Sequence, residues 1–269
     1  MSEKIIIAVA PTGGWGPVRG NPVRPEQIAK DVIACSRAGA SVVHLHARDK
    51  HGRLTTDLSN FNAAVSMIKS DCDIILEAST GGLSDLSARE RALPAKNPNA
   101  ELGSLNIGSL NFGDEVYRNS LPDVRIWVRL MSEAGVKPSL EIFDTGHLDT
   151  ALHLIEEGLV QPPCNFSFIF GVKWGMSFHP KLLDLLMDKL PPDSLWGALF
   201  VGSQDFEGHV AAAKYGAAFL RTGFEDSLSY DGKTAADNAE LVTALAARMR
   251  DEGFSIAGPA EARSILLRS

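Results

Sequence analysis

Two histidines separated by one residue are the first pattern in this sequence that could support chemistry. They stand in His44-Leu45-His46-Ala47-Arg48-Asp49, at the end of an apolar, β-branched run. Side chains of a β-strand alternate between its faces, so His44 and His46 point to the same side. Two imidazoles on one face of a buried strand can hold one first-row metal ion. The spacing is equally compatible with two hydrogen-bonded structural histidines.

A carboxylate near the end of the chain could complete such a metal site. The segment Arg221-Thr222-Gly223-Phe224-Glu225-Asp226 follows another apolar run. Glu225 would add a third ligand and leave positions for water or substrate. Alternatively, Glu225 and Asp226 merely begin a surface loop.

Two further segments place polar groups at or near the ends of apolar runs. Ser79-Thr80-Gly81-Gly82 joins hydroxyls to two glycines, whose backbone N–H groups can approach an anion closely, although glycine pairs are also ordinary turn residues. Glu141 lies within the apolar run at 137–144. Because burying an unpaired carboxylate is costly, Glu141 needs a partner such as an arginine or the metal shell.

The remaining histidines and the cysteines give weaker signals. We expect surface or packing roles for His51, His147, His153, His179 and His209. The cysteines are odd in number and widely separated, which favours buried thiols in a reducing compartment over disulfides. They are Cys35, Cys72 and Cys164.

The elements that must position these residues alternate along almost the whole chain. Short apolar or β-branched runs predict about eight strands, at 5–10, 41–47, 73–80, 102–109, 137–144, 165–171, 195–202 and 217–224. Segments with helical periodicity follow them, at 25–38, 59–69, 84–93, 124–134, 148–157, 180–190, 206–215 and 235–252, with a short helix from Glu261 that closes one end.

This alternation favours a (β/α)₈ TIM barrel in a single domain, residues 1–269. An open doubly wound sheet would have fewer strands and usually a dinucleotide or phosphate fingerprint, which we do not find. Barrel enzymes form their sites at the C-terminal ends of the strands. The second and eighth strands both neighbour the first, so His44, His46 and Glu225 can converge across the mouth.

The composition narrows the class of protein. A formal net charge of −7 without a basic stripe argues against a nucleic-acid partner. The N-terminal run is too short for a signal peptide, and no apolar run reaches the roughly 18 residues of a membrane span. We therefore expect a cytoplasmic location and no membrane partner.

Together these motifs resemble the β-keto acid cleavage enzyme family. The similarity runs nearly the full length and also includes Ala10-Pro11-Thr12-Gly13, Ser104-Leu105-Asn106-Ile107-Gly108-Ser109, Glu141-Ile142-Phe143-Asp144 and Pro259-Ala260-Glu261-Ala262-Arg263. The resemblance implies a zinc-bearing barrel, usually a homotetramer. Such enzymes exchange CoA between acetyl-CoA and a β-keto acid, which gives acetoacetate and a new acyl-CoA.

The resemblance also implies a role for each matching residue. The family's zinc ligands fall on His44, His46 and Glu225, and its acid–base pair falls on Arg221 and Asp226, with Asp226 removing the α-proton. Its loop for the substrate carboxylate falls on Ser79, Thr80, Gly81 and Gly82, and Ser104 and Glu141 match site positions more loosely.

One loop departs from the family pattern. In the founding enzyme, an acidic residue of this loop receives the amino group of 3-keto-5-aminohexanoate. No acidic residue stands between Thr12 and Pro25 here, so we expect a neutral or anionic side group, with Arg19 or Arg24 as its partner. Two other functions stay open: a metal-dependent aldolase or lyase that does not use CoA, and a non-catalytic barrel that binds a small acid.

Overall fold

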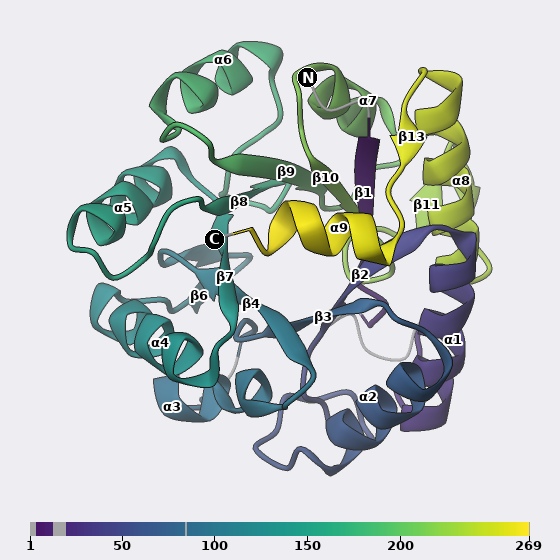
Figure 1. Cartoon of the computed structure of the whole chain (residues 1–269), viewed down its shortest axis with the longest axis horizontal. Coiled ribbons are helices and arrows are strands. Elements are labelled where there is room, and N and C mark those ends of the chain that lie inside the picture. The colour runs from purple at the N-terminus through teal and green to yellow at the C-terminus, as the bar shows by residue number, and fades with distance from the viewer. Residues whose placement is uncertain (1–3, 13–19, 84, 269) are drawn as a thin grey trace.

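The computed structural model describes residues 4–12, 20–83 and 85–268, and at its centre is a closed parallel barrel. Pairing of the last barrel strand with the first closes the ring (Figure 1). The predicted (β/α)₈ TIM barrel is confirmed. In ring order the strands are β1 (Lys4–Val9), β2 (Ala40–Leu45), β3 (Ile75–Ser79), β4 (Ala100–Asn106), β7 (Lys137–Ile142), β8 (Asn165–Phe170), β9 (Leu195–Phe200) and β10 (Phe219–Thr222).

Helices surround the barrel because the outward faces of its strands are apolar and must be covered. Ile7, Val43 and Leu140 are fully buried in the core between strands and helices. The helices are α1 (Pro25–Ala38), α2 (Ser59–Asp71), α3 (Ala88–Arg91), α4 (Leu121–Ala134), α5 (Thr145–Glu156), α6 (Pro180–Lys189), α7 (Glu207–Lys214) and α8 (Asn238–Asp251).

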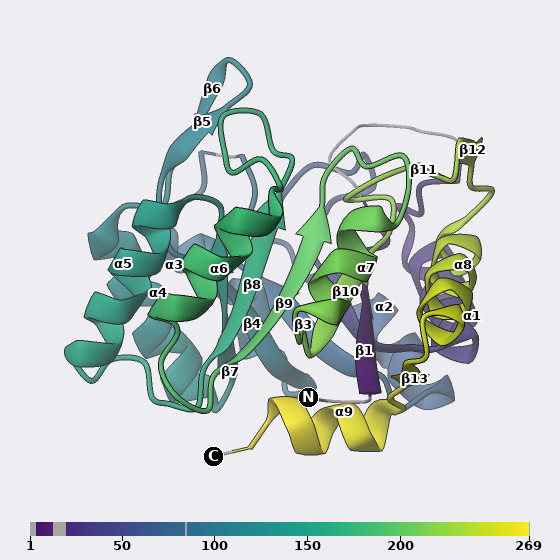
Figure 2. The same ribbon diagram turned by 90° about the horizontal axis from the view of Figure 1, so that it is seen from above.

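The N-terminal end of the barrel is closed by α9 (Pro259–Leu266), which lies across the base of the strands in Figure 2. Inward-facing Ile6 and Phe219 form one apolar cluster with Ala262 and Leu266 of this helix. The short strand β13 (Ser255–Ile256) pairs with the start of β1 and leads the chain into α9. This arrangement leaves the C-terminal mouth as the end where a site can form.

Several elements differ from those predicted. The helix expected at 84–93 is replaced by the single turn α3 and a 3₁₀ helix at Leu93–Lys96, since Pro94 lacks the N–H that would continue an α-helix. Two hairpins were not predicted, because their strands are too short to show alternation. They are β5 (Leu110–Phe112) with β6 (Glu115–Tyr117), and β11 (Ser229–Tyr230) with β12 (Lys233–Thr234).

Two other expectations concern the cysteines and the membrane. All three cysteines are free thiols; Cys35 and Cys164 are buried as expected, whereas Cys72 is only half-buried. In the part of the chain that the structure describes, no helix combines the length and apolar character needed to cross a bilayer.

Candidate active site

Strand register brings polar side chains of neighbouring strands to one level inside the mouth. Residues paired across parallel strands point to the same face, here the interior of the barrel. The pairs are His44 with Glu77, Ser79 with Ser104, and Asn106 with Glu141. All of these side chains are buried, so their polar atoms face one another or the cavity rather than bulk water.

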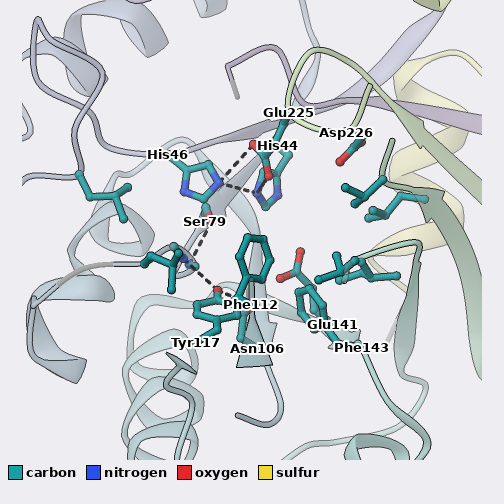
Figure 3. A pocket seen from close by; sticks show the side chains of 18 of the residues that line it. His44, His46, Ser79, Asn106, Phe112, Tyr117, Glu141, Phe143, Glu225 and Asp226 are labelled. Carbon is teal, nitrogen blue, oxygen red and sulfur yellow. Dashed lines mark hydrogen bonds and ion pairs between the residues drawn. The ribbon is translucent and has the colours of Figure 1, made fainter. Parts of the chain in front are cut away.

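Glu225 reaches the same mouth because the segment after β10 packs against the segment after β1. Gly223 has φ +137°, and a Cβ atom there would lie 2.3 Å from the carbonyl oxygen of Ala10. Only glycine tolerates both conditions. The N–H of Glu225 then donates to that carbonyl at 3.1 Å. This turn places the Glu225 side chain beside the two histidines (Figure 3).

His44, His46 and Glu225 form a cluster with the spacing of metal ligands. Their ligand atoms lie within 4.8 Å of one another. The two Nε2 atoms are 3.3 Å apart, and the Glu225 oxygens lie 3.6 Å from His44 Nε2 and 3.2 Å from His46 Nε2. A tetrahedral zinc ion with bonds of about 2.0–2.1 Å separates its ligand atoms by roughly 3.3 Å. The predicted ligand set is therefore assembled, and it fits a zinc-like divalent ion.

Glu77 supports this cluster from behind, although the sequence analysis gave it no role. Its Oε2 lies 2.7 Å from His44 Nδ1, so Nδ1–H donates to the carboxylate and Nε2 presents a lone pair to the cluster. Metal-binding histidines typically donate their second N–H to such a carboxylate. The signal that could have identified Glu77 is the one used for Glu141, a carboxylate inside an apolar run.

Burial and the neighbouring charges shift the pKa values of all three residues of the cluster. Burial opposes a charge on His44, yet Glu225 and Glu77 hold its pKa above the usual value. Burial lowers the pKa of His46 to about 4, so this imidazole is neutral. Burial also opposes ionisation of Glu225, but the two histidines and Arg221 hold its pKa well below the usual range. A neutral imidazole and an ionised carboxylate are the forms that bind metal, so His46 and Glu225 already have the binding form, whereas His44 would give up a proton when a metal binds.

Arg221 and Asp226 form a buried ion pair beside the cluster. Nε and Nη2 of Arg221 donate to the two carboxylate oxygens of Asp226 at 2.9 and 2.5 Å. Burial raises the pKa of Asp226 above its usual value, although the guanidinium opposes this shift. A positioned carboxylate with a raised pKa is suited to accept a proton in a reaction.

Glu141 has the arginine partner that its place in an apolar run required. Its Oε1 lies 3.7 Å from Arg221 Nη1, and Figure 3 shows its carboxyl group in the pocket. Burial raises the pKa of Glu141 to about 7. The Arg221 guanidinium therefore lies among three carboxyl groups, because it also donates to Glu225 at 3.3 Å.

The glycine-rich loop after β3 uses its backbone donors within the protein. Ser79, Gly81 and Gly82 line the cavity, whereas Thr80 is buried beneath them. Thr80 N–H donates to Ser104 Oγ at 3.3 Å, Gly81 N–H to Ser79 Oγ at 3.0 Å, and Gly82 N–H to the Tyr117 hydroxyl at 2.9 Å. The loop as a carboxylate-binding site stays a prediction.

Asn106 supplies a pocket-lining donor that the sequence analysis did not single out. Its Oδ1 accepts from the Tyr117 hydroxyl at 2.8 Å. Its Nδ2 is buried and finds no acceptor among the described residues. A buried N–H without an acceptor is costly, so this atom marks a place for a ligand oxygen. The available signal was its position two residues after Ser104, on the same strand face.

These groups surround one cavity of about 420 Å³ at the mouth of the barrel. His46 and Glu225 lie on one side of the pocket, and Phe112, Phe143 and Tyr117 lie on the other (Figure 3). The apolar wall, as we call it, consists of Phe112, Phe143, Ile169, Val172, Leu199 and Val201.

Neither arginine suggested as a partner for a substrate side group is among the described residues that line this cavity. Arg19 belongs to the segment 13–19, outside the described residues. Arg24 is exposed at the start of α1 and is not part of the cavity lining.

The parallel barrel carries a metal-ligand cluster, a buried acid–base pair and a cavity at its C-terminal mouth. This is the architecture of a metal-dependent barrel enzyme. Residues 4–267 match the family model described as beta-keto acid cleavage enzyme. This chain belongs to the β-keto acid cleavage enzyme family, as its motifs predicted.

Curated relatives span the whole length of the chain. The 3-keto-5-aminohexanoate cleavage enzyme of Fusobacterium nucleatum subsp. nucleatum is 35% identical, with 99% of this chain and 98% of the relative covered. The 3,5-dioxohexanoate:acetyl-CoA acetone transferase of Paraburkholderia graminis is 32% identical, with 98% and 96% covered. The expectation of an enzyme that cleaves carbon–carbon bonds and transfers acyl groups is confirmed at the level of the family.

A solved structure supports the fold independently. The ternary complex of ObcA with C4-CoA adduct and oxalate superposes with a TM-score of 0.75 at 21% identity. The superposition covers 92% of this chain and 67% of ObcA. At this identity the likeness concerns the barrel alone.

Proposed function

We propose that this chain condenses a β-keto acid with acetyl-CoA and releases acetoacetate and a new acyl-CoA. In the exchange, R–CO–CH₂–COO⁻ and CH₃–CO–S–CoA give CH₃–CO–CH₂–COO⁻ and R–CO–S–CoA, so atoms and charge balance. The observation that carries the proposal is the convergence of the cluster His44, His46 and Glu225 with the pair Arg221 and Asp226 at one cavity. Relatives named for acetyl-CoA-dependent transfer support it.

His44, His46 and Glu225 would hold a zinc ion. Three protein ligands leave a position for water or substrate, as in other catalytic zinc sites. When bound there, zinc supplies Lewis-acid polarisation of the substrate's keto oxygen, which lowers the cost of enolate formation at the adjacent carbon. The ligand spacing and the Glu77 carboxylate behind His44 support this assignment.

Asp226 would act as the base. It accepts the proton from the carbon between the keto group and the carboxylate, and burial makes it a stronger proton acceptor than an exposed aspartate. Arg221 orients Asp226 by holding both of its oxygens, and its charge limits the rise of that pKa. Glu141 lies on the other side of Arg221 and helps to balance its charge.

The substrate carboxylate would bind at the floor of the pocket near β3 and β4. Asn106 Nδ2 is the donor without an acceptor there, and Ser79, Gly81 and Gly82 line the same side. Ser104 and Thr80 support this surface from beneath, since Thr80 Oγ1 donates to the Ser104 carbonyl at 2.6 Å.

We also propose that the chain is a single domain, residues 1–269, that forms a homotetramer in the cytoplasm. The tetramer rests on the resemblance to the family, and a reducing compartment is consistent with three free thiols. Light scattering coupled to size-exclusion chromatography measures the subunit number directly.

The experiment that tests the function combines metal analysis with a panel of β-keto acids, each assayed with and without acetyl-CoA. We expect acetoacetate and acyl-CoA to appear in equal amounts, and only when acetyl-CoA is present. Cleavage without acetyl-CoA would instead favour a metal-dependent aldolase or lyase. Binding of the acids without turnover would favour a non-catalytic barrel.

Two substitutions separate the base from the metal ligands. Asp226→Asn should lower turnover by roughly 10²–10⁴-fold, because the amide cannot accept the proton. Its zinc content, measured by atomic emission, should stay that of the unmodified protein. His44→Ala serves as the comparison and should lose both metal and activity. If Asp226→Asn also lost the metal, Asp226 would be a ligand and not the base.

A further inference from the structure

The apolar wall lies across the mouth from the metal-ligand cluster. His44 lies on β2 and His46 directly follows it, and in the ring order of the barrel β8 stands opposite β2. Ile169 belongs to β8, Val172 follows that strand, and Leu199 belongs to the next strand, β9. A β-keto acid with its keto oxygen at the cluster and its carboxylate at Asn106 has one substituent left, the side group on the keto carbon. The apolar wall is the apolar part of the cavity lining that faces the cluster, and it can receive that group.

Buried hydrocarbon forms the deep part of this wall. Leu199 is 0% exposed and Ile169 is 2% exposed, and both belong to a cluster that also contains Phe143 and Val172. The two phenylalanines of the wall each pack edge to face against Tyr117, with ring centroids 6.0 Å apart for Phe112 and 5.9 Å for Phe143. A surface of packed rings and branched aliphatic side chains offers dispersion contacts to a ligand and no hydrogen bonds.

Most of the charged side chains that line the cavity lie elsewhere on its surface. Glu225 and Asp226 surround Arg221 on the β10 side. Glu141, on β7 two residues before Phe143, is the exception at the edge of the wall, and its carboxyl group already lies 3.7 Å from Arg221. The other two arginines, Arg48 and Arg53, lie on the segment after β2, where Arg48 donates to the Gly52 carbonyl at 2.9 Å and Arg53 to Asp49 at 2.9 Å. Among the described residues, the wall itself holds no charged side chain, so a charged side group placed against it would lose its hydration without gaining an ion pair from the wall.

We propose that the β-keto acid of this chain carries an uncharged hydrocarbon side group, bound by the apolar wall. This inference rests on the proposed function and adds the substrate class to it. Each methylene buried against such a wall raises kcat/KM roughly 4-fold, until the cavity is filled. The absence of acidic residues between Thr12 and Pro25 agrees with it, since a cationic side group finds no carboxylate in that segment of the sequence.

The first test compares three acids that differ in the charge of the side group, each assayed with acetyl-CoA. The probes are 3-oxohexanoate, the cationic 3-keto-5-aminohexanoate and the dianionic 3-oxoadipate. We expect kcat/KM for 3-oxohexanoate to exceed both others by about 100-fold or more, because an unpaired charge is costly to bury. It should also exceed the value for 3-oxopentanoate by roughly 4-fold.

The outcomes separate this inference from the function on which it rests. A preference for the cationic or the dianionic probe would overturn the hydrocarbon side group and leave the proposed exchange reaction intact. Failure of all the acids to react would overturn the exchange reaction itself, and the inference with it.

A second test alters the wall. Val201 lines the cavity and is half-exposed, so a polar substitution there should not unfold the barrel. Val201→Asp should lower kcat/KM for 3-oxohexanoate by roughly 30-fold or more and shift the preference toward the cationic acid. Val116→Asp is the matched control, because Val116 on β6 is exposed and lies outside the cavity lining, and it should stay within about 3-fold. The KM for acetyl-CoA should not change in Val201→Asp. A loss confined to that KM would mean that the wall binds the thioester arm, and the inference would be wrong.

Discussion

At the scale of single residues, the candidate site depends on groups that hold its named residues in place. His44 would be a weaker ligand without the Glu77 carboxylate, because that acceptor sets the imidazole tautomer and raises the basicity of Nε2. Asn106 likewise presents Nδ2 to the cavity because the Tyr117 hydroxyl occupies its Oδ1. Both supporting contacts are buried side-chain pairs between elements that are not consecutive in the chain.

Replacing the Glu77 carboxylate tests this support. Glu77→Gln keeps the shape and a hydrogen-bond acceptor but removes the charge, so the affinity for zinc should fall roughly 10- to 100-fold. Competition with a zinc-binding indicator dye measures the change without any assay of activity. Glu101→Gln is the matched control, because Glu101 binds Arg263 and lies away from the cavity lining. Equal zinc affinity in both variants would show that Glu77 has no such role.

At the scale of elements, a buried arginine joins the loop after β3 to the β5–β6 hairpin. Nε of Arg91 donates to the Thr80 carbonyl at 2.8 Å, and Nη1 donates to the Arg118 carbonyl at 2.6 Å. Its guanidinium also lies 4.3 Å from the ring centroid of Trp127 on α4. One side chain on the short helix α3 therefore positions two segments that border the cavity.

Removing these donors should affect both stability and substrate binding. Arg91→Met keeps the length of the side chain but leaves buried carbonyls without a donor, which should lower the free energy of unfolding by about 2–4 kcal/mol. The KM for the β-keto acid should rise more than kcat falls, because the loop that lines the carboxylate end loses its anchor. Chemical denaturation and steady-state kinetics measure the two effects. Exposed Arg129→Met on α4 is the control, and equal behaviour of the two variants would contradict the anchoring role.

At the scale of the whole molecule, the barrel closes where its first and last units meet, with α1 beside α8 in Figure 1. Asn238, at the start of α8, donates to the Pro11 carbonyl at 3.0 Å and to Asp31 at 2.7 Å, and it accepts from Phe224 N–H at 2.7 Å. This contact joins the segment after β1, helix α1 and the turn that carries Glu225. The geometry of the candidate site therefore depends on the closure of the ring.

The pH dependence of stability reports on this junction. Burial, together with the charge of Asp237, raises the pKa of Asp31 to about 7, against about 4 in an unfolded chain. The folded state then binds the extra proton, so this contribution to stability is complete below pH 4 and is lost as the pH rises to 7. Asp31→Asn should remove this loss of stability, because an asparagine side chain does not titrate. The Asp31 side chain is half-buried and partly screened by solvent. As the pH rises from 5 to 8, we therefore expect the free energy of unfolding of the variant to gain about 1–2 kcal/mol relative to that of the unmodified protein.

Urea unfolding at several pH values measures this difference. The exposed Asp149→Asn on α5 is a control for the general effect of removing one negative charge. A constant difference in unfolding free energy between Asp31→Asn and the unmodified protein across this pH range would contradict the raised pKa.

Local patterns in the sequence determined the barrel, its strand positions and the ligand set His44, His46 and Glu225. Alternation on strands, helical periodicity and polar residues at strand ends are properties of short segments, so they are visible without the fold. The resemblance to the family depended on the same short motifs. The short hairpins and the shortened α3 were missed, since neither is long enough to carry a period.

The tertiary structure alone decided which side chains meet. Glu77 is 33 residues from His44, and Asn238 is 227 residues from Pro11, so only strand register and ring closure bring these partners together. The apolar wall likewise collects residues from two barrel strands, from the segments that follow three barrel strands and from a hairpin, and each of these residues looks like an ordinary core position in its own segment. The physical reason is that spacing along a strand determines which face a side chain takes, whereas its neighbour across the barrel depends on how distant segments pack.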